Sequence, residues 1–165
     1  MKTLVQQQTE YNLWANERIA KLLSSIDSKL VDVDLKSSFP SIRKTVHHIW
    51  DAEMIWLSRL EGTKLTWPPT AQFKDPAIDD FLKTSRDLLN FVESKSVEYL
   101  NSDTSFTDSK GVPYKMNNAG ILMHVMNHST FHRGQLITML RELGITEIPQ
   151  TDLIKFLRDR DKAKI

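Results

Sequence analysis

The sequence predicts an all-α fold: a four-helix bundle that leaves room for a long crossover connection, with a short C-terminal helical tail, forming one domain over residues 1–165. Apolar residues recur at helical spacing through four long segments. The chain has 165 residues, of which 40% are hydrophobic and 26% charged, and this suits one globular domain with a sizeable core. Five glycines and six prolines are too few for long disordered segments.

Helix start and stop signals divide the chain into its predicted elements. Ser41 suits the N-cap of the second helix and Gly62 its end, while Gly144 suits the C-cap of the fourth helix. Pro76 is expected at the start of the third helix. The predicted helices cover residues 3–26, 41–61, 76–100 and 117–143.

The connections between these helices predict the topology. Residues 28–40 and 63–75 are polar or proline-containing loops. A helix of 20 residues spans about 30 Å, and 13 extended residues reach about 43 Å. The 63–75 loop can therefore run the length of the bundle, so simple up-down-up-down connectivity is not required. Residues 101–116 contain turn chemistry that fits a short hairpin, and residues 151–160 fit a short helix or a docked tail.

Composition excludes several classes of site. The chain has no cysteine, which rules out disulfides, thiolate zinc sites and a cysteine nucleophile, so a metal must use His, Asp, Glu or water. The net charge is +1 without a basic block, which argues against a nucleic-acid partner. The N-terminal stretch lacks the apolar run of a signal peptide, and no segment approaches the roughly 20 apolar residues that span a bilayer. We expect a cytoplasmic protein with no membrane partner.

The five histidines fall into two clusters that are far apart in sequence. An α-helix turns about 100° per residue, so His128 and His132 lie on the face of the fourth helix that is expected to point toward the protein core. His124 lies at the edge of that face and is not expected to be a ligand. In the second helix, His47 belongs to the solvated face. His48 lies on a flank nearer the interior, where a ligand role and an ordinary hydrogen-bonded histidine are both open.

The inward histidine pair suits a metal site. Imidazoles at positions i and i+4 share one helical face and can reach one ion, as they do in HExxH helices. Burial favours the neutral imidazole, which is the form that binds metal. His48 is the natural third ligand for His128 and His132, and three histidines with one vacant position are typical of catalytic sites. Imidazole suits zinc or nickel, with iron or copper as alternatives.

Other polar residues are candidates around this site. Glu53 points inward, and two roles are open for it: a carboxylate or general base near the metal, or a structural ion pair with Arg133 or another cation. The ion pair is the favoured interpretation. Arg133 itself is expected to point away from the core, toward the surface or a dimer interface. Gln135 could hydrogen-bond a ligand imidazole or face another helix. Core or interface positions are expected for Trp14, Trp50 and Trp56, the last at the mouth of a pocket.

Three motifs resemble those of the DinB family, the DNA-damage-inducible, YfiT-like group of metalloenzymes. They are YNLWAN at 11–16, HIWDAE at 48–53 followed by Trp56 and Leu57, and HSTFHRGQ at 128–135. Together they cover almost the whole chain in the order that the family has. The resemblance implies a four-helix bundle with a crossover, often a homodimer, with a metal on His48, His128 and His132.

The resemblance also implies a range of functions. Some relatives are metal-dependent transferases or isomerases that use low-molecular-weight thiols such as bacillithiol, mycothiol or glutathione. We therefore expect a divalent-metal-dependent transferase or hydrolase-like enzyme that acts on a small molecule. The alternatives are a non-catalytic, stress-associated metal-binding dimer and a bundle whose histidines bind no metal. A solvent-reachable cavity beside the histidines would favour the enzyme.

Overall fold

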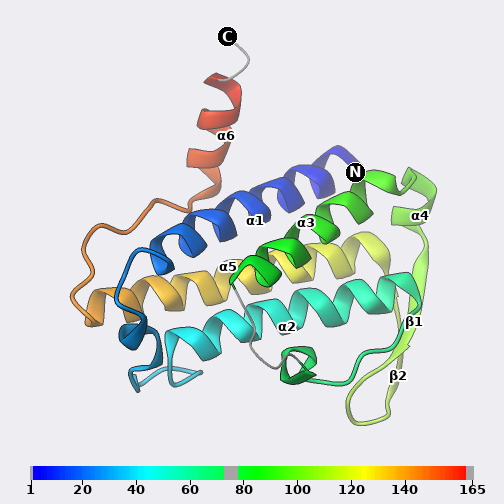
Figure 1. Cartoon of the computed structure of the whole chain (residues 1–165). Helices are drawn as coiled ribbons and strands as arrows, with labels where there is room; N and C mark the ends of the chain where they lie inside the picture. The colour runs from blue at the N-terminus through cyan, green and yellow to red at the C-terminus, as the bar shows by residue number, and fades with distance from the viewer. Residues whose placement is uncertain (1, 73–77, 163–165) are drawn as a thin grey trace.

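Four long helices pack side by side in the computed structural model, which describes residues 2–72 and 78–162 (Figure 1). Helix α1 contacts α3 and α5, and helix α2 also contacts α3 and α5, so α1 and α2 lie on a diagonal of the bundle. The all-α fold class is therefore confirmed. The bounds of these helices are α1 Lys2–Leu23, α2 Ile42–Glu61, α3 Ile78–Ser94 and α5 Asn118–Glu142.

The connection between α2 and α3 is the predicted crossover. Both helices run in the same direction along the bundle, so the connection between them carries the chain back along the bundle (Figure 1). A short 3-10 helix, η2 (Pro69–Gln72), lies on this return path. The expectation that Pro76 begins the third helix lies outside the described residues. No described helix has the length and apolar character needed to cross a bilayer.

The ends of α2 and α5 follow the capping signals of the sequence. The Ser41 hydroxyl accepts a hydrogen bond from the Lys44 amide, and Gly62 closes α2 in the left-handed conformation at φ 74°. The Asn117 side chain accepts from the Gly120 amide at the start of α5. Gly144 follows this helix at φ 80°. These two helices carry all five histidines, so their boundaries set where the histidines lie.

Two predicted helices are shorter in the structure, and a serine lies next to the end of each. Helix α1 ends at Leu23, where the Ser24 hydroxyl donates back to the Ala20 carbonyl oxygen. The third helix ends at Ser94, and Ser96 caps a separate helix, α4 (Val97–Asn101), by accepting from the Tyr99 amide. Serine hydroxyls compete with helical backbone hydrogen bonds, which apolar periodicity alone does not register.

Smaller elements cover the ends of the bundle. A 3-10 helix, η1 (Ser28–Asp32), interrupts the loop after α1, and the predicted hairpin is present as β1 (Asp103–Thr107) and β2 (Pro113–Asn117), which pair antiparallel. Helix α6 (Leu153–Lys162) projects from the bundle, and its buried Phe156 packs on Tyr11 and Trp14 (Figure 1).

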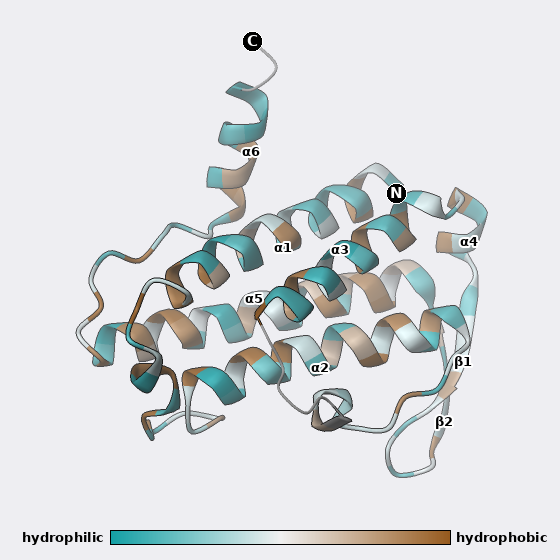
Figure 2. Cartoon of the chain, viewed as in Figure 1, coloured by the Kyte–Doolittle hydropathy of each residue, from teal (hydrophilic) through white to brown (hydrophobic). Residues whose placement is uncertain are grey.

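The apolar core is divided into two halves by a polar layer. Apolar and hydrophilic residues alternate along each long helix (Figure 2). One apolar half contains Leu57, Leu88 and Leu122, and the other contains Ile49, Phe81 and Leu136. Between them, each long helix contributes buried polar side chains to the middle of the bundle. These are Asn12, Asn16, Glu53, Ser85, Ser129 and Arg133.

A hydrogen-bond network connects this polar layer. Arg133 Nη1 donates to Oδ1 of Asn12 at 2.6 Å and of Asn16 at 2.9 Å. Because a guanidinium only donates, both amide oxygens accept, and both amide nitrogens are left to donate. They donate to Oε1 of Glu53 at 2.7 and 2.9 Å. Ser85 Oγ donates to Oε2 of the same carboxylate at 2.6 Å.

This network corrects two expectations for Arg133 and Glu53. Arg133 is 1% exposed rather than at the surface, because α5 packs against both α1 and α2 and its buried face is correspondingly wide. Its link to Glu53 runs through the two asparagine amides, and among the described residues the two charged groups form no direct ion pair. Burial raises the pKa of the Glu53 carboxyl, and its hydrogen bonds and the charge of Arg133 counteract that rise.

Replacing Arg133 with Met should lower the free energy of unfolding by about 3–5 kcal/mol, because the buried carboxylate and two amide oxygens lose their compensating charge. Urea unfolding of the purified variant measures this loss. The control is Arg86→Met, which breaks an exposed ion pair with Glu17 at 3.2 Å and should cost about 1 kcal/mol or less. Equal losses in the two variants would show that the buried network is not a major source of stability.

Candidate metal centre

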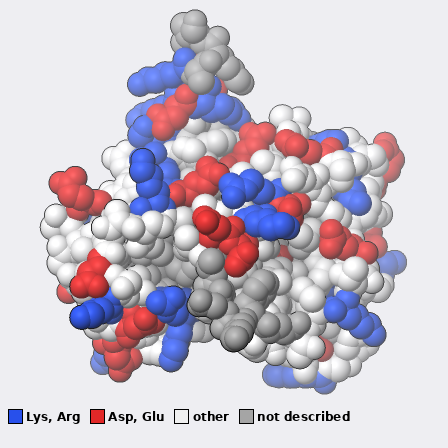
Figure 3. Space-filling view, in the orientation of Figure 1, with Lys and Arg blue, Asp and Glu red and all other residues white. Residues whose placement is uncertain are grey.

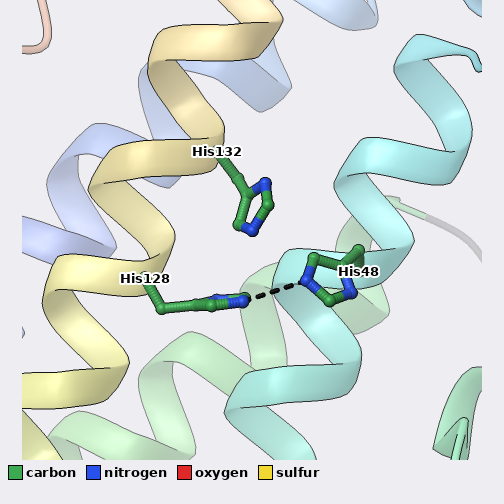
Figure 4. A group of neighbouring side chains, drawn as sticks. All are labelled: His48, His128 and His132. Carbon is green, nitrogen blue, oxygen red and sulfur yellow. Dashed lines mark hydrogen bonds between the residues drawn. The ribbon is translucent and has the colours of Figure 1, made fainter. Parts of the chain in front are cut away.

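Three histidines meet where α2 faces α5. His48 comes from α2, and His128 and His132 come from adjacent turns of α5 (Figure 4). One ring nitrogen of each histidine lies within 4.8 Å of the other two, an arrangement that could hold a metal ion. The helices run antiparallel, so residue 48 of one helix lies opposite residues 128 and 132 of the other. The structure thus brings together the three residues singled out from the sequence.

The other two histidines lie outside this cluster. His124 is exposed, one turn from His128, with 5.9 Å between ring centroids. His47 is half-buried, and its ring meets the edge of Trp50 at 6.0 Å. The sequence placed His47 on a solvated face, so its partial burial is a correction. The nearby indole shields it because Trp50 lies one turn further along the same helix.

Gln135 orients the His132 ring. The Gln135 Oε1 atom lies 2.8 Å from His132 Nδ1, and Gln135 Nε2 donates to Ser38 Oγ at 3.0 Å. An amide oxygen can only accept, so Nδ1 of His132 carries the proton in this contact. The Nε2 atom of the neutral ring then has a free lone pair for a metal. Of the two roles that the sequence left open for Gln135, the structure shows the hydrogen bond to an imidazole.

His48 and His128 face each other through their Nε2 atoms, which are 2.9 Å apart (Figure 4). One ring must donate and the other accept, so this contact uses only one lone pair. The buried Nδ1 atom of His128 has no hydrogen-bond partner in the described part of the chain. A nitrogen-only donor set of this kind suits a divalent ion, which binds the unprotonated form of each ring.

Aromatic residues from two loops cover His48. Phe39 stacks on the His48 ring with centroids 4.1 Å apart, and it meets the edge of His132 at 5.6 Å. Trp67 meets the edge of His48 at 5.9 Å. The sequence assigned both loops only as connections and missed these residues. A large aromatic side chain in an otherwise polar loop, as in SSFP at 37–40, is a signal that something apolar must cover it.

A pocket of about 790 Å³ begins at the histidine cluster. His124 and His128 line it, and it extends between α2, the segment after Gly62, and strand β1. Exposed lining residues, such as Lys64 and Trp67, connect it to solvent. Trp56 also lines this pocket, as expected from the sequence. The cluster therefore has a solvent-reachable cavity beside it.

Glu53 lies in the polar layer rather than in the pocket. Its side chain is completely buried, and its oxygens accept from asparagine and serine side chains of α1, α3 and α5. A general base needs a route to the proton that it removes. The candidate role of Glu53 as a base beside the metal therefore has no support from its surroundings, which are those of a structural carboxylate.

Partial burial keeps the facing histidines neutral. Burial, assisted by the charge of His132 when it is protonated, lowers the pKa of His48 to about 4. Burial and the neighbouring histidines likewise lower the pKa of His128 to about 4. Both rings are thus in the metal-binding form at neutral pH.

The metal-free protein should lose stability as the pH falls from about 6.5 to about 4. In that range the unfolded chain binds protons at His48 and His128 that the folded chain does not. Urea midpoints measured against pH in the presence of a chelator test this. Because carboxylates also contribute, the double variant His48→Gln/His128→Gln should show a shallower decline, and His124→Gln the original one. Parallel curves for all three proteins would contradict the lowered pKa values.

The family resemblance and the fold agree with comparisons to known proteins. The sequence profile of the DinB family matches residues 1–162. The chain is 30% identical over 166 aligned residues to Protein DinB of Bacillus subtilis, covering 93% of this chain and 95% of that protein. Its fold is similar to that of a DinB-like protein from Bacillus subtilis, with TM-score 0.66, 20% identity and coverage of 88% of this chain and 97% of that one. It is also similar to a DinB-like protein from Bacillus cereus, with TM-score 0.58, 22% identity and coverage of 82% and 89%. The chain therefore belongs to the DinB family.

Proposed function

We propose that this protein is a divalent-metal-dependent enzyme, a transferase that uses a low-molecular-weight thiol. His48, His128 and His132 would hold the metal, with zinc or nickel best suited to the three imidazoles. The observation that carries the proposal is the pocket of about 790 Å³ that begins at His128. A small molecule in that pocket would lie beside His128, one of the three clustered histidines.

The donor set supports a catalytic rather than a structural metal. Structural zinc sites are closed by four protein ligands, whereas catalytic sites use three and keep one position open. Within the described residues, the three histidines form a group without a fourth His, Asp or Glu. A metal held there would supply Lewis acidity, lowering the pKa of a water or thiol. Because the chain has no cysteine, the thiol must come from a small molecule.

The residues around the histidines have separate roles in this proposal. Gln135 holds the proton of His132 on Nδ1, so that Nε2 remains a ligand. Phe39 covers the face of His48 and excludes water from that side. Trp56 and Trp67 form walls of the pocket on the open side of the cluster. Substrate would therefore approach along the pocket rather than through the bundle.

A second candidate function is a non-catalytic, metal-binding dimer associated with stress. One observation favours it: Phe131, next to His132 in sequence, is 63% exposed on α5. Exposed aromatic side chains are common in the central parts of protein interfaces. In that case the metal site would stabilise the protein or serve in sensing, and the pocket would hold no substrate. The two candidates differ in whether a metal-loaded protein transfers a thiol.

Replacing His132 with Ala should remove the metal and any transfer activity together, because two imidazoles hold a divalent ion far less tightly than three. Elemental analysis of protein purified without a histidine tag should find about one ion per chain in the parent and almost none in the variant. Transfer of glutathione or bacillithiol to monochlorobimane measures the activity. His47→Ala, which changes a histidine outside both the cluster and this pocket, is the matched control. Full activity in a metal-free His132→Ala protein would disprove the proposal.

Replacing Gln135 with Leu should weaken metal binding by about 10–100-fold, because the His132 ring loses the acceptor that sets its tautomer. Competition against a chromophoric chelator measures the affinity. Gln150→Leu, at an exposed position, changes the same residue type and should leave the affinity unchanged. An affinity for Gln135→Leu equal to that of the parent would mean that this hydrogen bond does not prepare the site.

A further inference from the structure

Arg59 contacts the aromatic wall of the pocket at the end away from the histidine cluster. Its guanidinium carbon lies 4.4 Å from the ring centroid of Trp56 and 4.7 Å from that of Phe106. Stacking on aromatic rings uses the faces of the guanidinium and leaves its N–H groups pointing outward in the plane. Both aromatic residues and Arg59 line the same pocket.

The N–H groups of Arg59 have no acceptor in the described part of the chain. The charge of Asp108 acts on the pKa of Arg59, but Asp108 accepts no hydrogen bond from it. The Oδ1 atom of Asp108 accepts from the amides of Lys110 at 2.8 Å and Val112 at 2.9 Å. Partial burial lowers the pKa of Arg59, and Asp108 opposes that change. A guanidinium nevertheless stays charged in proteins. Arg59 is therefore a partly desolvated cation whose N–H groups are available for a ligand, since no described residue accepts from them.

The pocket connects Arg59 to the histidine cluster through a series of ring contacts. Arg59 lies over Trp56, whose ring is 5.3 Å from that of His124. The ring of His124 is in turn 5.9 Å from that of His128. A molecule of moderate size could thus contact both ends of the pocket. The charged lining residues are Arg59, Lys64 and Asp108, which favours an anion overall.

We propose that the pocket binds a small-molecule carboxylate, with the carboxylate on Arg59 and an apolar planar body against Trp56 and Phe106. A guanidinium matches a carboxylate through two parallel hydrogen bonds, and the aromatic wall suits a flat body. The binding end of the ligand is then fixed, and the opposite end lies toward His128. This extends the proposed function by naming a ligand class, and it rests on that function only for the chemistry at the histidine end.

The test compares phenylbutanoate with its neutral amide, phenylbutanamide, on the metal-free protein at low salt. Calorimetry measures the affinities, and the fluorescence of Trp56 and Trp67 reports occupancy of the pocket. The carboxylate should bind about tenfold or more tightly than the amide, since a hydrogen bond to a charged group is at stake. Arg59→Gln should abolish this preference. Arg59→Lys should retain part of it, because an ammonium cannot form the paired contact.

Arg18→Gln is the matched control. Arg18 also stacks on a tryptophan, with 4.8 Å between its guanidinium carbon and the Trp14 ring, but outside this pocket. Its loss should leave both affinities unchanged. Equal binding of the two probes to the parent protein would overturn the proposal, and this comparison needs no variant to fold. Three other results would also overturn the proposal: no saturable binding, a preference for the carboxylate that survives in Arg59→Gln, or a preference that is lost in Lys64→Gln instead.

This experiment and the metal experiment fail independently. Binding of the carboxylate is measured without metal, so a protein without transfer activity can still show the Arg59-dependent preference. Conversely, a metal-loaded and active protein that binds acid and amide equally would keep the proposed function and lose the carboxylate site.

Discussion

The buried pairing of Arg133 with Glu53 through Asn12 and Asn16 is the constraint on which the rest of the structure depends. A charge removed from water must be compensated locally, and here four helices supply the compensating groups. The donors and acceptors match only when α1, α2 and α5 keep one axial register. A shift of one turn would leave a buried charge without a partner. Apolar packing alone tolerates such shifts far better.

That register also determines the histidine cluster. Glu53 follows His48 by five residues on α2, and Arg133 directly follows His132 on α5. Holding the two charged residues at one level of the bundle therefore holds the histidines opposite each other. The cluster lies where the polar layer reaches the side of the bundle, and the pocket continues from it toward β1. Acidic and basic side chains are interspersed on the face of the molecule seen in Figure 3. Inside the pocket, Arg59 is a partly buried cation that stacks on Trp56 and Phe106.

The sequence predicted the elements best where local physics decides them. Ser41 and Gly62 bound α2 as expected, because capping involves only neighbouring residues. The third helix was predicted too long, since apolar periodicity continues past the point where Ser96 starts a new helix. The prediction that Arg133 points away from the core was wrong, because it assumed that a single apolar stripe of α5 faces inward. Helix α5 instead has neighbouring helices on two sides, so its buried face is wider. Phe39 was missed because nothing local connects a loop residue to an imidazole on another helix.

The sequence by itself predicted the helices, the family and the three histidines, because helical periodicity, capping and short motifs are properties of neighbouring residues. Loop length allowed a crossover, and the family resemblance implied it. It also supplied the absence of cysteine, which excludes thiolate ligands. Only the tertiary structure decided that Gln135 orients His132, that Glu53 belongs to a structural network, and that Arg59 lies in the pocket of the histidines. Each of these depends on contacts between residues far apart in the chain, and the packing of four helices sets those contacts.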